Sequence, residues 1–118
     1  MAVKLVECPE LQDEKLKKKL VYISGPYKAP TIYEVWANIQ LAKKYAEKYW
    51  KKGCYVFCPH LNSGFLDSVA PEAHFLESGL VFLRLCDIVV MLPNWRSSNG
   101  AAAERLLAVQ LEKEIIYE

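Results

Sequence analysis

Four short apolar runs divide the chain, and each has the length and composition of a buried strand. They cover residues 20–24, 54–58, 88–92 and 114–117, and polar or helix-forming stretches separate them. Strands that alternate with helices predict a parallel sheet with right-handed crossovers and helices on both faces. We therefore predict an α/β protein of three layers, Rossmann-like or flavodoxin-like, with a sheet of four to five strands.

The stretch after the first strand carries the clearest helix signal. Thr31 and Glu34 have the spacing of a capping box, and Gly53 is a typical residue just beyond a helix end. The apolar positions between them recur with helical periodicity and predict one buried face. This predicted face consists of Ile32, Val35, Trp36, Ile39, Ala42, Ala46 and Tyr49.

A second helix is predicted to begin at Pro71 and Glu72 and to end near Leu85. Its predicted core stripe contains Gly79, a residue that costs a helix on the order of 1 kcal/mol relative to alanine. A glycine at that place indicates close approach of a backbone or a ligand. The whole stripe is Phe75, Gly79, Phe82 and Cys86, and residues 61–70 before the helix are expected to form an irregular loop that could cover a site.

Composition limits the classes of protein that fit. The 118 residues suffice for one domain, 1–118, in which residues 1–19 form a weakly defined extension. In that extension we expect an edge strand at residues 3–6 and a polar helix at residues 10–19. With 53% hydrophobic residues, 25% charged residues and a net charge of +1, neither a disordered tail nor nucleic-acid binding driven by overall charge is expected.

No signal peptide or membrane-spanning run is recognisable, so we expect a cytoplasmic protein with reduced cysteines. Cys54, Cys58 and His60 could suggest a metal site. Four residues along a strand separate the two sulfurs by roughly 13 Å, however, which is too far for one ion. The loop at 25–30 matches neither a dinucleotide-binding nor a Walker pattern, so no cofactor is expected.

The stretch from 86 to 112 contains the strongest candidate site. A buried strand at 88–92 leads into a polar turn, and a helix of good helix formers is predicted at 101–112. In open α/β sheets, ligands bind beyond the carboxyl ends of the strands, where helix N-termini offer free N–H groups. His60 follows the second strand and falls on the same presumed side, as a ligand-binding or a merely structural residue.

Glu104 is the unusual residue of that helix. Leu107, Ala108 and Leu111 lie three, four and seven positions after it, so Glu104 shares or borders the apolar face. The positive end of the helix dipole favours its ionised form. A partly desolvated carboxylate beside a ligand-binding turn can act as a nucleophile. The alternative is a carboxylate at the edge of the core that is paired with a lysine or arginine.

Three segments resemble the nucleoside 2-deoxyribosyltransferase-like superfamily, which includes deoxynucleoside 5′-monophosphate N-glycosidases. They are Val21-Tyr22-Ile-Ser-Gly25-Pro26-Tyr27, Gly53 with Val56-Phe57-x-Pro59-His60, and Asp87-Ile-Val-Val-Met-Leu-Pro-x-Trp95-x-x-Ser98-x-Gly100-x-x-x-Glu104. The similarity extends over residues 20–118. It implies cleavage or exchange of the N-glycosidic bond of a deoxynucleoside or its 5′-monophosphate, without cofactor or metal, in an assembly of two or more copies.

The resemblance also implies roles for particular residues. Glu104 matches the nucleophile that forms a covalent glycosyl intermediate, as in retaining glycosidases. Tyr22 matches a tyrosine near that nucleophile, and at Gly25 a side chain would crowd the ligand. Ser98 matches the position that contacts the 5′ end of the sugar. The remaining expected substrate-binding residues are Ser97, Gly100, His60 and Trp95, of which Trp95 stacks on the base or simply packs on the sheet.

One position departs from the superfamily pattern. Its characterised members carry an aspartate eight positions before the residue that matches Asp87, where this chain has Gly79. Glu77, two residues earlier, points elsewhere on an ideal helix, and His60 and Asp67 are other possible acids. Weak catalysis, or a module that binds nucleotides without turning them over, is therefore the alternative function. Tyr33, Tyr45 and Trp50 are the aromatic residues expected to be exposed and available for an interface.

Overall fold

The structure is a computed structural model, and it describes residues 13–118. Helices and strands alternate through this part of the chain, with one turn of 3-10 helix, η2, before the last helix. In chain order the elements are β1 (Leu20–Ser24), α1 (Ile32–Lys51), β2 (Tyr55–Phe57), α2 (Pro59–Ser63), α3 (Glu72–Leu85), β3 (Ile88–Met91), η2 (Trp95–Ser97), α4 (Asn99–Gln110) and β4 (Glu114–Tyr117).

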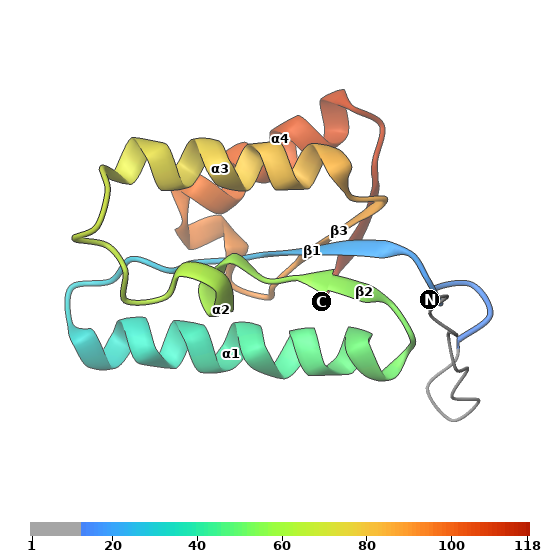
Figure 1. The fold of residues 1–118 in the computed structure, drawn as a ribbon, viewed down its shortest axis with the longest axis horizontal. Coiled ribbons are helices and arrows are strands. Elements are labelled where there is room, and N and C mark those ends of the chain that lie inside the picture. Colours follow the sequence, from blue (N-terminus) through green and yellow to red (C-terminus); the bar gives the residue numbers. More distant parts are fainter. Residues whose placement is uncertain (1–12) are drawn as a thin grey trace, which may run out of the picture.

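The described strands form one four-stranded sheet in the order β2-β1-β3-β4, and every pairing is parallel. Helix α1 covers one face of the sheet, and α3 and α4 cover the other (Figure 1). The predicted α/β architecture is therefore confirmed. The chain passes from β1 outward to β2 and then returns across β1 to β3. This reversal makes the boundary between β1 and β3 the switch point at which open sheets of this type bind ligands.

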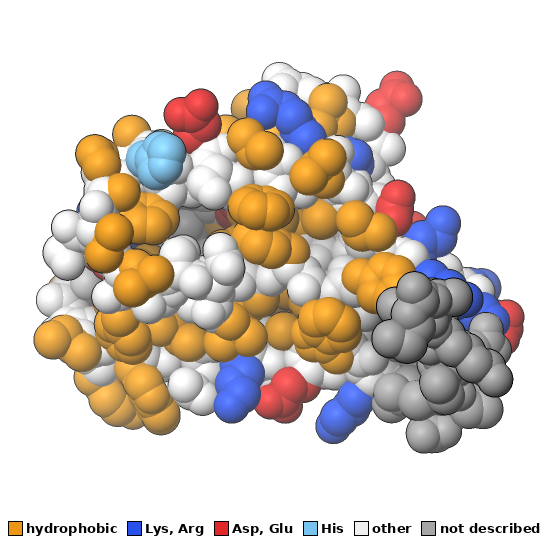
Figure 2. All heavy atoms as spheres, viewed as in Figure 1, with side chains coloured by type: hydrophobic (Ala, Val, Ile, Leu, Met, Phe, Trp, Pro, Cys, Tyr) orange, Lys and Arg blue, Asp and Glu red, His pale blue; other side chains and the backbone are white. Residues whose placement is uncertain are grey.

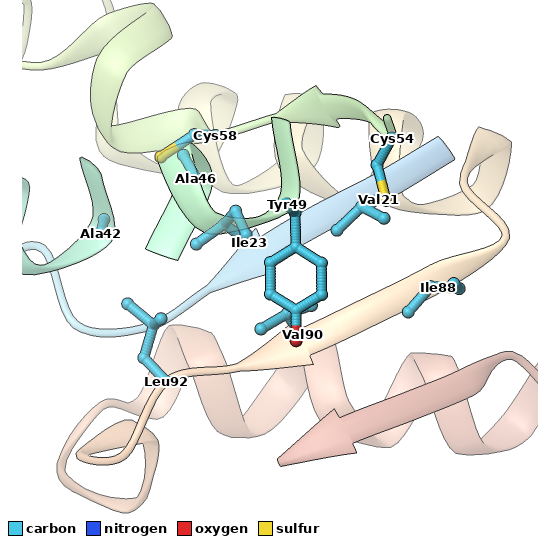
Figure 3. Packing of buried hydrophobic residues seen from close by; sticks show 10 residues of the cluster. All are labelled: Val21, Ile23, Ala42, Ala46, Tyr49, Cys54, Cys58, Ile88, Val90 and Leu92. Carbon is cyan, nitrogen blue, oxygen red and sulfur yellow. The ribbon is translucent and has the colours of Figure 1, made fainter. Parts of the chain in front are cut away.

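Side chains of the central strands alternate between the two faces, as expected for a period of two. Val21 and Ile23 of β1 join Val90 of β3 in the core beneath α1, where Tyr49 lies across the strands (Figure 3). On the other face, Tyr22 contributes to a second core under α3 and α4. That second core consists of Tyr22, Leu83, Cys86, Val89, Met91, Ala101 and Ala108.

Helix α1 has the predicted ends but a shorter buried face than predicted. Ile32 is 80% exposed and Trp36 48% exposed, whereas Ile39, Ala42, Ala46 and Tyr49 are buried. The first turns of α1 extend beyond the strands, so they have no sheet to cover (Figure 1). In α3 the stripe is also shifted: Leu83 is fully buried, and Phe82 is partly exposed while its ring stacks on Phe57.

Two predicted segments differ from the structure. The helix expected at residues 10–19 is only a turn over residues 13–19, where Lys18 has a φ of 62° that interrupts helical geometry. Residues 10–12 and the strand expected at 3–6 lie outside the described residues. The loop expected at 61–70 begins as helix α2, because Pro59 occupies its first position and the Leu61 and Asn62 N–H groups donate to the Cys58 carbonyl.

Helix α4 begins two residues before its predicted start, because Ser98 caps it and accepts a hydrogen bond from the Ala101 N–H at 3.1 Å.

Across residues 13–118, none of the helices is both long and apolar enough to span a bilayer. The face seen in Figure 2 carries apolar side chains along α1 and at the β2 edge of the sheet, where Tyr55 is exposed.

The N-terminal cap of α1 can be tested by unfolding. Thr31 accepts from the Glu34 N–H at 3.1 Å, and the Glu34 carboxylate accepts from the Thr31 N–H. Replacing Thr31 by alanine removes the first of these bonds at an exposed site, so urea unfolding should show a loss of about 1 kcal/mol. Thr31→Ser keeps the hydroxyl and should lose only a few tenths of a kcal/mol. Equal losses for both variants would contradict the capping role.

Candidate functional site

A cavity of about 690 Å³ lies at the carboxyl ends of β1 and β2 and along α3 and the start of α4. This is the position expected from the switch point of the sheet. Its size falls within the range of small-molecule sites. The residues that line it are Tyr22, Gly25, Tyr27, Lys28, Pro59, His60, Ser63, Asp67, Glu72, Phe75, Leu76, Gly79, Leu80, Ser97, Ser98, Asn99, Gly100, Ala101, Ala103 and Glu104.

A smaller cavity of about 140 Å³ adjoins the first one between α2 and α3. The two cavities share Pro59, Ser63, Phe75 and Gly79 as lining residues. Asn62, His74 and Ser78 add polar groups to the smaller one. Gly79 thus stands at the place where the two cavities meet, beside the carboxylate of Glu104.

Glu104 is held by two hydroxyl groups from one strand. The Tyr22 phenol donates a short hydrogen bond to Oε2, and the Ser24 hydroxyl donates to Oε1 at 3.0 Å. Tyr22 and Ser24 are two residues apart on β1, so their side chains point to the same face of the sheet, toward α4. No lysine or arginine among residues 13–118 forms an ion pair with Glu104. The carboxylate lines the cavity, and no basic neighbour neutralises it.

Burial decides the protonation of this carboxyl. Removal from water raises the pKa of Glu104 to about 7, against the opposing effect of the hydrogen bonds from Tyr22 and Ser24. The helix dipole favours the ionised form, but burial opposes it more strongly, so the protonated and ionised forms of Glu104 coexist near neutral pH. Glu104 is the sixth residue of α4, and the dipole effect fades beyond the first turn. Glu104 is therefore poised to exchange a proton near pH 7.

Tyr22 is almost fully buried, although it also lines the cavity. Its side chain is 1% exposed, and its ring stacks on Phe57 with 5.8 Å between centroids. Burial, reinforced by the negative charge of Glu104, raises the pKa of the Tyr22 phenol well above its usual value. The phenol therefore stays protonated and acts as a hydrogen-bond donor to Glu104.

The start of α4 forms another part of the cavity wall. Ser97, Ser98 and Gly100, which were expected to bind substrate, all line it together with Asn99. Both serine hydroxyls already have partners within the protein. Ser97 donates to the Asn94 carbonyl at 2.8 Å, and Ser98 caps the helix. A ligand at this wall would meet backbone and amide groups as well as these hydroxyls.

Gly25 lines the cavity, but a contact within the protein is what leaves no room for a side chain at this position. A Cβ atom at Gly25 would lie 2.5 Å from Cδ1 of Leu92 and 2.9 Å from its Cγ. Crowding of a ligand, which the resemblance implies, is thus not needed to account for this glycine. Leu92 is fully buried beneath α1 and has little room to move.

His60 also lines the cavity but is 5% exposed and bonded to the protein. Its Nε2 lies 2.9 Å from the Pro26 carbonyl oxygen, which can only accept, so Nε2 carries the proton. Its Nδ1 faces the Cys58 sulfur at 3.9 Å. Burial lowers the pKa of His60 and keeps the ring neutral. His60 therefore joins the loop after β1 to the end of β2.

Trp95 is not among the residues that line the cavity. It packs against the second core and lies 6.3 Å from the ring of Tyr117. The guanidinium groups of Arg96 and Arg105 stack over it, at 4.8 and 5.2 Å from the ring centroid. Of the two interpretations of Trp95, packing at the sheet is the one that the structure supports.

The outer wall contains residues that sequence reasoning missed. The Tyr27 phenol donates to Asp67 at 2.5 Å and accepts from the Phe65 N–H at 2.7 Å, which joins the loops after β1 and α2. Lys28 pairs with Glu72 at 2.7 Å across the same opening. Tyr27 and Lys28 follow directly after the Gly25-Pro26 pair of the predicted ligand loop. Their position next to this pair could have identified them as residues of the cavity wall.

Of the three alternative acids, Glu77 does not line the cavity, His60 is neutral, and Asp67 lines it at an exposed position. Among residues 13–118, no three His, Cys, Asp or Glu side chains gather closely enough to hold a metal ion. Tyr33 and Trp50 are exposed as expected, but Tyr45 packs against the core.

The fold and the cavity define a Rossmann-like α/β protein with a carboxylate, that of Glu104, in a cavity at the carboxyl ends of its parallel strands. The chain belongs to the DUF4406 family, a domain of unknown function, whose model matches residues 19–117. Membership of this family leaves the activity open.

Among solved structures, the chain is similar to "2-desoxiribosyltransferase from Leishmania mexicana", with a TM-score of 0.61 and 19% sequence identity. The matched region covers 84% of this chain and 63% of that protein, so the chain spans less than two thirds of its neighbour's length. At this identity the likeness establishes the fold. No curated protein matches the sequence.

The raised pKa of Glu104 predicts how stability depends on pH. The folded pKa of about 7 exceeds the reference value of 4.5, so folding favours the protonated form, and this advantage is lost as the pH rises through 7. Glu104→Gln should therefore gain about 2–3 kcal/mol relative to the native protein between pH 5 and pH 8. Urea unfolding at both pH values measures this gain.

Glu47→Gln, at an exposed position on α1, is the matched control and should show no such gain. A difference between Glu104→Gln and the native protein that stays constant from pH 5 to pH 8 would show that Glu104 is not desolvated in the folded state.

Proposed function

We propose that this protein cleaves or exchanges the N-glycosidic bond of a deoxynucleoside or a deoxynucleoside 5′-monophosphate, with Glu104 as the nucleophile. The observation that carries the proposal is a carboxylate at a cavity wall that hydroxyl groups, and no described cation, hold in place. A carboxylate neutralised by a cation would be a poorer nucleophile. The resemblance of the segments around Tyr22 and Glu104 to the deoxyribosyltransferase-like superfamily supports the same activity.

The reaction follows the two-step course of retaining glycosidases. An oxygen of ionised Glu104 attacks C1′ of the sugar, and the electron pair of the breaking C1′–N bond leaves with the base, which takes up a proton. Water or a second base then attacks C1′ and restores the carboxylate. Tyr22 and Ser24 fix the orientation of the carboxylate, since each donates to a different oxygen of it.

The remaining walls offer contacts for the other parts of such a substrate. The 690 Å³ cavity is large enough for a nucleoside-sized molecule. Phe75, Leu76 and Leu80 give α3 an apolar surface that a base can lie against. Ser97 of η2 and Asn99 and Gly100 at the start of α4 line the same cavity, and we expect them to contact the sugar end of the substrate. Asp67 and Glu72 at the rim are exposed, so the cavity opens to water that can supply the proton for the departing base.

One observation favours a second candidate. Because Gly79 supplies no carboxylate, the chain lacks the aspartate expected at that position of helix α3. A protein that kept the cavity but binds nucleotides without cleaving them would fit this feature. Calorimetry would then register binding of a deoxynucleoside monophosphate, while no free base appears over the same period.

The two candidates are separated by an assay for base release. The native protein is incubated with each deoxynucleoside and its 5′-monophosphate, and free base is followed by chromatography. We expect release by the native protein and a loss of at least 100-fold in Glu104→Gln, because the amide cannot form the glycosyl ester. Glu77→Gln, at a position on α3 outside the cavity, is the control and should retain release.

Base release that Glu104→Gln retains in full would refute the proposed role of Glu104. Binding without release by the native protein would support the nucleotide-binding module instead.

A further inference from the structure

The backbone of Gly79 approaches Tyr22 and Glu104 so closely that a side chain at this position has no room. A Cβ atom built on Gly79 would lie 2.7 Å from the Tyr22 hydroxyl oxygen and 3.6 Å from Oε2 of Glu104. The first distance is shorter than carbon and oxygen atoms tolerate without displacement. Gly79 is inside α3, where alanine has the better helix propensity. Backbone conformation therefore does not require this glycine, whereas the space beside Tyr22 does.

Tyr22 has little freedom to make room. Its ring belongs to the central strand β1 and stacks on Phe57, which in turn stacks on Phe82 of α3 with 4.2 Å between centroids. The phenol oxygen is in contact with both helices: Gly79 of α3 approaches it closely, and Glu104 of α4 accepts its hydrogen bond. A side chain at position 79 would therefore have to push the phenol away from Glu104 or lift α3 off the sheet.

We infer that Gly79 is a positioning residue that acts through Tyr22: the missing side chain on α3 leaves the space that the Tyr22 hydroxyl needs to donate to Glu104. The catalytic role of Gly79 in this inference rests on the proposed function. The packing of Gly79 against Tyr22 does not depend on it. An aspartate at position 79 of this chain would displace the phenol that holds the nucleophile.

The inference predicts an unusual coupling between two substitutions. Gly79→Ala should destabilise the protein that has Tyr22, because the new methyl group meets the hydroxyl oxygen. Tyr22→Phe removes that oxygen, and the next nearest atom of the ring, Cζ, lies at 3.9 Å from the added Cβ. When Gly79→Ala is added to the Tyr22→Phe variant, it should then be neutral or stabilising, as expected for alanine in a helix.

The experiment compares the native protein, the two single variants and the double variant by thermal and urea unfolding. We expect Gly79→Ala to lower the midpoint of the native protein and to leave the midpoint of the Tyr22→Phe variant unchanged or raise it. Gly100→Ala is the matched control, since its Cβ would meet only Leu76 and Ser98 side-chain atoms at 3.5 and 3.8 Å. It should have the same effect in both backgrounds.

A second readout connects the packing to Glu104 without relying on turnover. Carbon NMR titration of the Glu104 carboxyl reports its apparent pKa in all four proteins. The Tyr22 hydrogen bond lowers this pKa, so its loss should raise it. We expect a higher value in Gly79→Ala and in Tyr22→Phe, and no further rise in the double variant. If Gly79 served only the packing of α3, Gly79→Ala would change the midpoint of unfolding and leave the titration of Glu104 unaffected.

Equal effects of Gly79→Ala in both backgrounds, on the midpoint or on the titration, would overturn the inference. The proposed function can fail separately: coupling in both readouts, without base release by the native protein, would support the positioning of Glu104 and refute the glycosidic reaction.

Discussion

A carboxylate removed from water must be compensated inside the protein, and in this chain the compensation comes from two hydroxyl groups of one strand. Tyr22 and Ser24 donate to the two oxygens of Glu104, and no charge from a lysine or arginine among residues 13–118 reaches it. Neutral donors offset only part of the desolvation, which leaves the pKa of Glu104 near 7. The carboxyl is thus kept both accessible to protons and oriented toward the cavity.

The arrangement depends on the topology of the sheet. Because β1 and β3 are neighbours at the switch point, the loops that follow them diverge, and the cavity opens between them. Helix α4 returns from β3 over β1 and brings Glu104 above Tyr22 and Ser24. Helix α3 closes the other side, where Gly79 allows a close approach to the phenol. The same four-stranded framework can hold other chemistry, so the function depends on these side chains and not on the fold alone.

Local patterns in the sequence predicted the framework well. The strand at Glu114–Tyr117 and the cap at Thr31 are where apolar runs and capping chemistry place them. Helical periodicity also placed Glu104 at the border of the core. Such features depend on residues near one another in the chain, and this is why they can be predicted. The exposure of Ile32 could not be predicted in this way, because it depends on where α1 extends past the sheet.

Contacts between distant segments account for the rest of what sequence reasoning missed. Ser24 shares a face of β1 with Tyr22, and the two-residue spacing was a signal that went unused. The reason for Gly79 was only partly foreseen: a close approach was expected, but the atom that approaches is the hydroxyl of Tyr22, 57 positions earlier in the sequence. Likewise, both ring nitrogens of His60 face protein atoms, and only the folded chain brings Pro26 to it.

The central claim is that Glu104 attacks the sugar. The most direct measurement is to mix the protein with a deoxynucleoside, stop the reaction in acid within its first turnover, and determine the mass of the intact protein and of its peptides. The account predicts a mass increase of one deoxyribosyl group, confined to the peptide that contains Glu104. Free base released without any such adduct, or an adduct on another residue, would contradict it.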